Sequence, residues 1–306
     1  MRVIVVGLGV QGHKRSRIAG DDFVASVDPI NPEADYKTAA DVPLADFDAV
    51  LACVPDEPKK ELLSYFLSNG KHVLVEKPLW VAEEADIPGL ERLARRNGAV
   101  LYTAYNHRFE PHYRRMRDLI ASGALGELYS CRMFYGNGTA RLVRQSAWRD
   151  QGAGVLMDLG SHLLDTCRFW FGEIEDSFRL ICANRFENRA PDHVIISSET
   201  HRPRIELEMT LCMWRNHFTC DVLAEKGSAH IESLCKWGPT TFIHRTRVLP
   251  SGRPPEQAVP LVQEDPTWAL EYEHFKRLCA DGAQTDLSGD LWLHRALHRL
   301  GGEAAR

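Results

Sequence analysis

A glycine-rich turn directly after the first apolar run constrains the fold of this chain most strongly. The run Val3–Val6 leads at once into Gly7–Gly12, which has the spacing Gly-x-Gly-x-x-Gly. Between a strand and a helix, this spacing permits a tight turn and a close approach of the backbone to a pyrophosphate, whose charge the N–H groups at the helix start bind. Such glycines can also be purely structural. The cofactor-binding residues predicted here are Gly7, Gly9, Val10, Gln11 and Gly12.

An aspartate follows the second apolar run at the distance that a dinucleotide site requires. Asp28 directly follows Phe23–Val27, about 20 residues after the first glycine. A carboxylate there accepts hydrogen bonds from both ribose hydroxyls of NAD and repels the extra phosphate of NADP. In the alternative, Asp28 only begins a turn with Pro29. We expect NAD, and NADP stays open because basic residues lie nearby in the sequence. These are Lys14, Arg15 and Lys37.

Short apolar runs alternate with amphipathic segments over the first 105 residues. The five runs are Val3–Val6, Phe23–Val27, Ala49–Val54, Val73–Val75 and Val100–Tyr105. This alternation is typical of βαβ units, in which helices connect the strands of a parallel sheet. The fold class predicted for this part is α/β, with a doubly wound Rossmann domain.

The pattern changes from about Gly123 onward, where strand-like runs follow one another with few helices between them. They are Leu128–Tyr135, Phe178–Ala183, Val194–Ser198, Ile205–Met213, Phe218–Leu223 and Ala229–Ile231. Such runs predict a largely antiparallel sheet with one face open or covered by a partner.

Helices and loops complete the predicted α+β domain. We expect a long helix at about Val155–Phe171, a surface loop from Pro250 to Pro266, and closing helices at Trp268–Ala280 and Asp290–Leu300. The expected domains are residues 1–122, which bind the dinucleotide, and residues 123–306, which bind substrate and form the oligomer. The C-terminal helix can pack back on the first domain.

Composition excludes several classes of protein. Lys and Arg number 37 against 42 Asp and Glu, a net charge of −5, which argues against a nucleic-acid binder. No apolar stretch approaches the ~20 residues that cross a bilayer. The first apolar run is too short for a signal peptide. The eight cysteines form no Cys-x-x-Cys pair and no zinc-like cluster with histidines. We therefore expect a cytoplasmic protein with reduced thiols, no membrane partner and no metal.

Three further stretches carry side chains capable of chemistry. They are Gly70–Leu79, which contains Glu76-Lys77-Pro78; Tyr105–Pro111, which contains Asn106 and Arg108; and Gly152–Asp165, which contains Asp158 and His162. Together with the glycine turn, these motifs resemble the glucose–fructose oxidoreductase, inositol dehydrogenase and MocA (Gfo/Idh/MocA) family of nicotinamide-dependent oxidoreductases. The resemblance covers most of residues 1–172 and is vague beyond about residue 175.

The resemblance implies a two-domain enzyme whose second sheet makes subunit contacts, as a homodimer or homotetramer. Lys77 resembles the active-site lysine of the family's Glu-Lys-Pro motif, and Glu76 accompanies it beside the cofactor. Asp158 and His162 resemble the family's Asp-x-x-x-His pair, in which the histidine carries the proton. The substrate residues implied are Asn106 and Arg108. Common substrates of the family are sugars, polyols and nucleotide sugars.

Physical arguments from the residues agree with these roles. At about 100° per residue, Asp158, His162 and Asp165 share one face of the predicted helix. The alternative is an ordinary solvated face. Lys77 ends a predicted strand, at the edge of a parallel sheet where ligands bind. Alternatively, Lys77 is an ordinary surface lysine beside Glu76.

Two local features qualify the resemblance. After the third strand, the family often has Pro-x-x-x-His, where this chain has Pro55 followed by Lys59. Pro55 is expected to contact the cofactor, and the lysine puts those contacts in doubt. The stretch Trp148–Gly152 is also compact, which can narrow the substrate cleft. Trp148, Trp214 and Trp237 are candidates to stack on a sugar ring, with Trp148 taken as a substrate residue, although the residue type itself favours a core or interface position for each.

The function expected is hydride transfer between NAD(P) and a secondary alcohol or ketone of a small-molecule substrate. His162 would act as base and Lys77 would stabilise the charge on oxygen. Two alternatives stay open. One is an enzyme that uses the cofactor transiently for sugar elimination or glycosidic cleavage, and the other is a non-catalytic sensor that binds the dinucleotide.

Overall fold

The structure is a computed structural model and describes residues 1–146, 149–198 and 203–305. The chain forms two compact units, each of which is described by itself. Unit 1 consists of Met1–Asn106 and Thr267–His294, and unit 2 consists of His107–Pro266 and Arg295–Arg306. The first unit therefore ends earlier than the expected boundary at residue 122, and it takes in a segment from near the C-terminus.

Unit 1 is built on a five-stranded parallel sheet. Its strands, in spatial order, are β2 (Phe23–Val27), β1 (Val3–Val6), β3 (Ala49–Ala52), β4 (His72–Glu76) and β5 (Leu101–Ala104). The strand order reverses between β1 and β3, and the crevice outside such a reversal is where open α/β sheets bind ligands. The predicted doubly wound Rossmann sheet is confirmed, and its first two strands have the predicted bounds.

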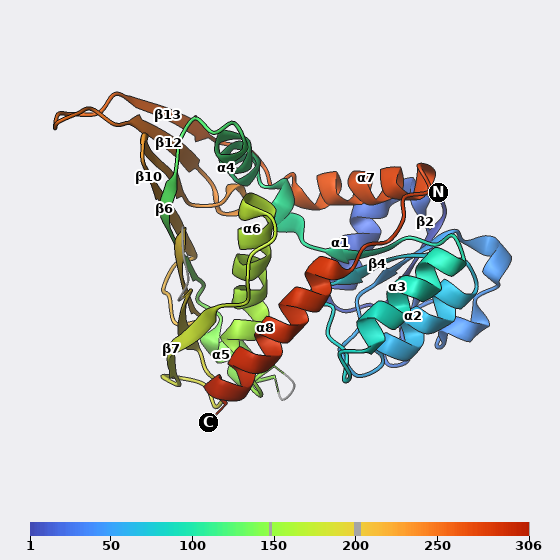
Figure 1. Ribbon diagram of the computed structural model, residues 1–306. Coiled ribbons are helices and arrows are strands. Elements are labelled where there is room, and N and C mark those ends of the chain that lie inside the picture. Colours follow the sequence, from blue (N-terminus) through green and yellow to red (C-terminus); the bar gives the residue numbers. More distant parts are fainter. Residues whose placement is uncertain (147–148, 199–202, 306) are drawn as a thin grey trace. The chain divides into compact units, whose positions relative to one another are not determined.

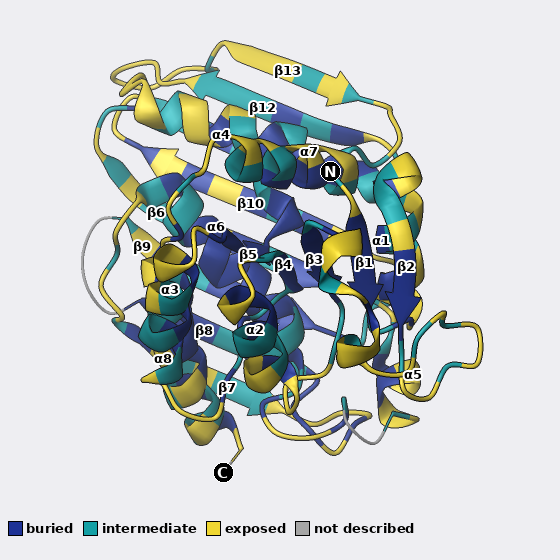
Figure 2. Ribbon diagram, turned by 90° about the vertical axis from the view of Figure 1, so that its right-hand side faces the viewer, coloured by how far each residue is buried: buried dark blue, intermediate teal, exposed yellow. Residues whose placement is uncertain are grey.

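Helices cover both faces of this sheet because side chains alternate along each strand. Val3 and Val5 pack in a cluster with Phe275. Ile4 packs on the other face in a cluster with Phe66. The first face carries α1 (Val10–Ala19) and α7 (Thr267–Ala280), and the second carries α2 (Lys59–Ser68) and α3 (Asp86–Arg96). Figure 2 shows the central strands β1 and β3 as buried, as expected for a doubly covered parallel sheet.

Unit 2 is built on an eight-stranded sheet. Its order is β13-β12-β11-β10-β6-β9-β8-β7. All neighbours are antiparallel except β6 and β9, so the predicted, largely antiparallel sheet is confirmed. The strands are β6 (Leu128–Gly136), β7 (Phe178–Asn184), β8 (His193–Ser198), β9 (Arg204–Thr210), β10 (His217–Ala224), β11 (Gly227–Glu232), β12 (Thr240–Thr246) and β13 (Glu256–Leu261).

The expected loop from Pro250 to Pro266 is wrong in part, because it contains β13. This strand pairs with β12 from Arg245, opposite Glu256, to Thr240, opposite Leu261. It lies at the edge of the sheet and is exposed along most of its length (Figure 2). An edge strand tolerates a proline whose missing N–H faces away from the ladder, so Pro260 does not prevent the pairing.

Helices α4 (Pro111–Ala121) and α6 (Ser161–Phe171) lie on the same side of this sheet (Figure 1). The indole Nε1 of Trp170 on α6 donates to the backbone oxygen of Tyr113 on α4 at 3.0 Å, and Tyr113 packs on Phe218 of β10. These contacts explain why α4 belongs to unit 2 rather than to the Rossmann unit. The short helix α5 (Ala140–Arg144) also belongs to unit 2.

The last helix, α8 (Ser288–Ala304), contributes its residues up to His294 to unit 1 and the remainder to unit 2. Among the described residues, no helix is long and apolar enough to span a membrane. Each of the eight cysteines is a free thiol.

Candidate functional site

The three glycines of the first turn have different surroundings. Gly7 has φ +90°, and a Cβ there would lie 2.4 Å from the backbone oxygen of Cys53, which follows β3. A Cβ on Gly12 would lie 2.0 Å from the backbone oxygen of Gly7. A Cβ on Gly9 would meet nothing within 4 Å. Two glycines are therefore required by packing, while the middle one borders open space at the start of α1, which begins at Val10 and continues through Gln11.

Asp28 stabilises this turn by accepting three backbone hydrogen bonds. Its Oδ2 accepts the N–H of Leu8 at 2.7 Å, and its Oδ1 accepts the N–H groups of Ile30 and Asn31 at 2.8 Å each. Partial burial by itself raises the pKa of Asp28. The hydrogen bonds donated by the backbone N–H groups of Asn31, Ile30 and Leu8 outweigh it and hold the pKa below its usual range. The aspartate thus begins the turn, as the structural alternative expects. A carboxylate has about four acceptor positions, so it also retains capacity for a ribose hydroxyl.

The basic residues near the turn are held by other groups. Arg15 is 1% exposed, and its guanidinium bonds to Glu76 at 2.7 Å and to Glu271 of α7 at 2.8 Å. The ammonium of Lys14 lies 3.7 Å from the centre of the Trp268 ring. Lys37 donates to the backbone oxygen of Asn31 at 2.7 Å. Burial therefore removes Arg15 as a surface contact for an extra phosphate.

Glu76 and Lys77 follow one another at the carboxyl end of β4. Oε1 of Glu76 accepts Nε of Arg15 at 2.8 Å, so the carboxylate predicted to lie beside the cofactor holds an arginine of α1. Lys77 is half-buried and precedes Pro78 through a cis peptide bond.

The turn after β3 carries the lysine that departs from the family pattern. Pro55 is exposed, while Lys59 is buried at the start of α2. Nζ of Lys59 donates to Oδ1 of Asp56 at 2.6 Å and to the backbone oxygen of Pro78 at 3.0 Å.

Asn106 has a structural partner within unit 1. Its side chain is buried and donates to Oγ1 of Thr267 at 2.8 Å, which ties the end of β5 to the start of α7. The residue implied to contact substrate thus holds two segments that lie far apart in the sequence.

In unit 2, the predicted Asp-x-x-x-His pair spans a change of helix type. Leu156–Gly160 form a π-helical turn, and α6 begins at Ser161. Such turns often mark functional sites. Oδ2 of Asp158 lies 3.2 Å from the guanidinium of Arg149, and the Asp158 side chain is 38% exposed. His162 is buried in α6.

Two of the three side chains on the predicted polar face, His162 and Asp165, are buried, and only Asp158 is partly exposed. The alternative interpretation, in which this face is simply solvated, is therefore wrong. Nε of Arg108 donates to Oδ2 of Asp165 at 3.0 Å, and a second bond joins the same side chains. Burial raises the pKa of Asp165, while the charge of Arg108 opposes that shift. Arg108, implied to line the substrate site, forms this two-pronged pair with Asp165.

The structure surrounds His162 with residues that the sequence did not single out. The ring of His107 stacks on the ring of His162, with centroids 4.0 Å apart. Nζ of Lys236 lies 3.4 Å from Nε2 of His107 and donates to the hydroxyl of Tyr135 at 2.8 Å. We call His107, His162, Tyr135 and Lys236 the histidine cluster. No local pattern identifies it, because its members are distant in sequence.

A buried pair anchors the turn that carries Lys236. The thiol of Cys235 donates to Oε2 of Glu110 at 2.7 Å, and the N–H of Cys235 donates to Oε1 at 3.2 Å. Burial raises the pKa of Glu110. Trp237, next to Lys236, packs on Tyr135 at 5.6 Å. Trp148, predicted to stack on a sugar, lies outside the described residues.

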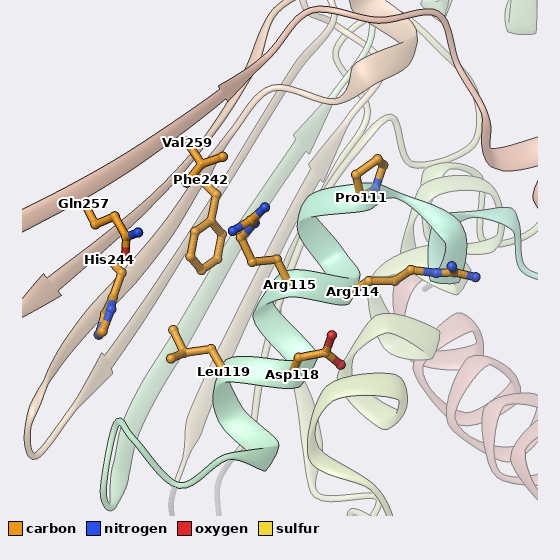
Figure 3. Close-up of a pocket in the computed structure, with 9 residues that line it drawn as sticks. All are labelled: Pro111, Arg114, Arg115, Asp118, Leu119, Phe242, His244, Gln257 and Val259. Carbon is orange, nitrogen blue, oxygen red and sulfur yellow. The ribbon is translucent and has the colours of Figure 1, made fainter.

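A pocket of about 500 Å³ lies elsewhere in unit 2, where α4 faces β12 and β13 (Figure 3). Arg114 and Arg115 line it from the helix, and Phe242 and His244 line it from β12. None of its lining residues belongs to the predicted site or to the histidine cluster. Across residues 1–146, 149–198 and 203–305, no three His, Cys, Asp or Glu side chains group in a way that could hold a metal ion.

Family models match both parts of the chain. Residues 1–105 match the model described as an oxidoreductase family with an NAD-binding Rossmann fold. Residues 113–230 match the model of the GFO/IDH/MocA C-terminal domain.

Individual relatives match over part of their length. The chain is 28% identical to the rhizopine catabolism protein MocA of Rhizobium meliloti, over 58% of this chain and 60% of that protein. It is 30% identical to trans-1,2-dihydrobenzene-1,2-diol dehydrogenase of Oryctolagus cuniculus, over 60% of this chain and 55% of that protein. The chain thus spans little more than half the length of these relatives.

Solved structures share the fold over the whole chain. Levoglucosan dehydrogenase in complex with NADH superimposes with a TM-score of 0.82, covering 100% of this chain and 96% of the other. The two sequences are 17% identical, so this likeness concerns the fold alone.

Proposed function

The chain belongs to the glucose–fructose oxidoreductase, inositol dehydrogenase and MocA family, and on this premise we propose that it transfers a hydride between NAD and a secondary alcohol or ketone. The substrate class that we propose is a sugar, a polyol or a nucleotide sugar. NADP is the alternative cofactor.

The observation that carries the proposal is the contrast among the three glycines. Gly7 and Gly12 have no room for a Cβ, while the space beside Gly9 is open at the start of α1. The first N–H groups of a helix have no partner within the helix, and they attract a phosphate. Asp28, fixed by three backbone N–H groups, presents an ionised carboxylate for ribose hydroxyls. These residues fit a dinucleotide.

In the proposed chemistry, the cofactor handles the hydride, and the side chains handle the proton and the charge on the substrate oxygen. Bound NAD supplies the group that accepts or donates the hydride. His162 takes the proton of the substrate hydroxyl, a role for which an imidazole is well suited near neutral pH. The ammonium of Lys77 stabilises negative charge that develops on the substrate oxygen. Asp158, paired with Arg149, orients the base or binds a second hydroxyl.

The histidine cluster supports the role of His162. Stacking on His107 restricts the plane of the His162 ring, and pre-organised geometry is a large part of the advantage of an enzyme over free reactants. Lys236 lies beside His107 and donates to the hydroxyl of Tyr135, whose ring packs near both imidazoles, and these contacts further restrict the two rings.

Two measurements test the proposed function. NADH and NADPH fluorescence titrations report which dinucleotide binds, and we expect NADH to bind more tightly. Purified protein with NAD and a panel of polyols, sugars and nucleotide sugars is then followed by absorbance of reduced nicotinamide. A net dehydrogenase accumulates NADH with one of these alcohols, whereas a transient-redox enzyme forms products without it. A sensor binds NADH and converts none of the panel, a result that overturns the proposal.

We also propose that the sheet of unit 2 mediates self-association as a homodimer or homotetramer. Along β10, Phe218, Cys220 and Val222 are buried, while Asp221 and Leu223 are exposed on the other face. Light scattering on the purified protein gives the particle mass, and a mass of one chain at micromolar concentration contradicts this part of the proposal.

A further inference from the structure

Lys59 is a buried ammonium in an unfavourable place. Its side chain is 2% exposed, and it is the first residue of α2. Removing an ammonium from water is unfavourable unless hydrogen bonds and opposite charges in the protein compensate for the lost hydration. The start of a helix also carries partial positive charge, which repels a cation. Its hydrogen-bond partners must therefore account for its position.

The ammonium of Lys59 has two hydrogen-bond partners, a carboxylate and a backbone oxygen. Asp56, whose Oδ1 lies 2.6 Å from Nζ, is 49% exposed, so an ion pair with it could form at the surface. The backbone oxygen of Pro78 lies 3.0 Å from the same Nζ. The bond to Pro78, rather than the one to Asp56, therefore accounts for the buried position of the ammonium beside the segment that follows β4.

The segment around Lys77 is held on both sides by charged groups. Before Lys77, the carboxylate of Glu76 bonds to the buried Arg15. After it, the carbonyl of Pro78 bonds to Lys59. Lys77 therefore lies between two anchored neighbours, one fixed by α1 and the other by α2.

We propose that Lys59 is a positioning residue for Lys77. Its ammonium holds the carbonyl of Pro78 and so keeps the segment 77–81 in one conformation. The inference rests on the proposed function, in which the ammonium of Lys77 acts on the substrate oxygen. Positioning of this kind matters because a displacement of about 1 Å can cost roughly a hundredfold in rate.

Hydrogen exchange measured by mass spectrometry on the full chain tests the proposal without any need for turnover. In Lys59→Met, we expect the backbone amides of residue 77 and residues 79–81 to exchange about tenfold faster (Pro78 has no N–H), while those of β1 and β3 keep their wild-type rates. The matched control is Lys60→Met. Lys60 is the next residue, is 48% exposed and pairs with Asp86 at 2.9 Å. Its variant should exchange as the wild type does.

Two further variants separate positioning from support of the helix start. Asp56→Asn leaves the bond from Lys59 to Pro78 available, so exchange in 77–81 should stay within about twofold of wild type. Lys59→Gln keeps an N–H donor without the charge and should give a smaller acceleration than Lys59→Met. It also serves if Lys59→Met does not fold.

Kinetics gives the second readout. We expect kcat of Lys59→Met to fall about ten- to a hundredfold, with the KM for NAD within about threefold of wild type. Unchanged exchange in 77–81, acceleration throughout unit 1, or an equal effect of Asp56→Asn overturns the positioning role. Turnover that survives in Lys77→Met overturns the proposed function instead, and the exchange result still decides whether Lys59 orders the segment.

Discussion

The imidazole of His107 lies over that of His162, with ring centroids 4.0 Å apart and ring planes inclined by 20°. His107 follows β5 in a short 3-10 turn, and His162 lies in the first turn of α6. The side chain proposed to carry the proton is thus oriented by a residue 55 positions earlier, which the sequence alone did not indicate.

His162→Asn tests the proton carrier. Without an imidazole to accept the proton, kcat should fall by roughly 10²–10⁴, while NADH affinity stays near wild type. Steady-state kinetics and fluorescence titration measure the two quantities. The matched control is His298→Asn, since His298 is exposed on α8, and it should behave as wild type. Normal turnover in His162→Asn contradicts the assignment.

Gly9→Ala and Gly12→Ala test the glycine turn against each other. A Cβ on Gly9 meets nothing in the protein, so the fold should keep its melting temperature while the methyl group obstructs the dinucleotide and lowers NADH affinity at least about tenfold. A Cβ on Gly12 lies 2.0 Å from the backbone oxygen of Gly7, so that variant should unfold at a lower temperature. Thermal unfolding and NADH titration are the measurements. Full NADH affinity in Gly9→Ala would show that nothing binds beside this glycine.

Asp28→Asn should change stability in a pH-dependent way. Because the pKa of Asp28 is lowered in the folded protein, the ionised carboxylate adds stability that is fully present above the ordinary carboxyl pKa of about 3.9. That contribution is lost as the pH falls through the folded-state value. The difference in unfolding free energy between wild type and variant should therefore be constant near neutrality and shrink below about pH 4. Denaturant titrations at pH 7 and pH 3 measure it, and a difference that grows in acid contradicts the account.

Arg108→Ala distinguishes a structural arginine from a substrate contact. Its removal leaves the buried carboxylate of Asp165 without its cation, which should cost about 3 kcal/mol of unfolding free energy. Denaturant titration measures the loss. If stability is unchanged and only the KM for substrate rises, Arg108 binds substrate as the family resemblance implies, and its pairing with Asp165 is incidental.

Much of the fold follows from local sequence patterns. The strands of unit 1 are continuous apolar runs bounded by turn residues, so β1 and β2 could be predicted to the residue. Edge strand β13 could not, because it is polar, exposed and contains Pro260. The placement of α4 also escaped prediction, since its assignment to unit 2 depends on contacts such as that of Tyr113 with Trp170, 57 residues apart.

In the candidate site, too, some features follow from local sequence and others depend on long-range contacts. The glycine turn, Asp28 and Lys77 stand in motifs that a single segment displays. Asp28 is held by nearby backbone N–H groups, but other site residues depend on distant partners: Lys59 reaches Pro78, which follows Lys77, and Lys236 reaches His107, which stacks on His162, over 129 residues. A sequence shows which side chains are capable of chemistry, whereas long-range packing decides what holds them.

Turnover of the wild type, Lys77→Met and His162→Asn in one assay tests the central claim most directly. Each protein is first shown to bind NADH, and is then given NAD with the alcohol of the panel on which the wild type is most active. We predict that the wild type accumulates NADH and that each variant, still binding the dinucleotide, is slower by at least about a hundredfold. Wild-type rates in both variants would contradict the proposed chemistry.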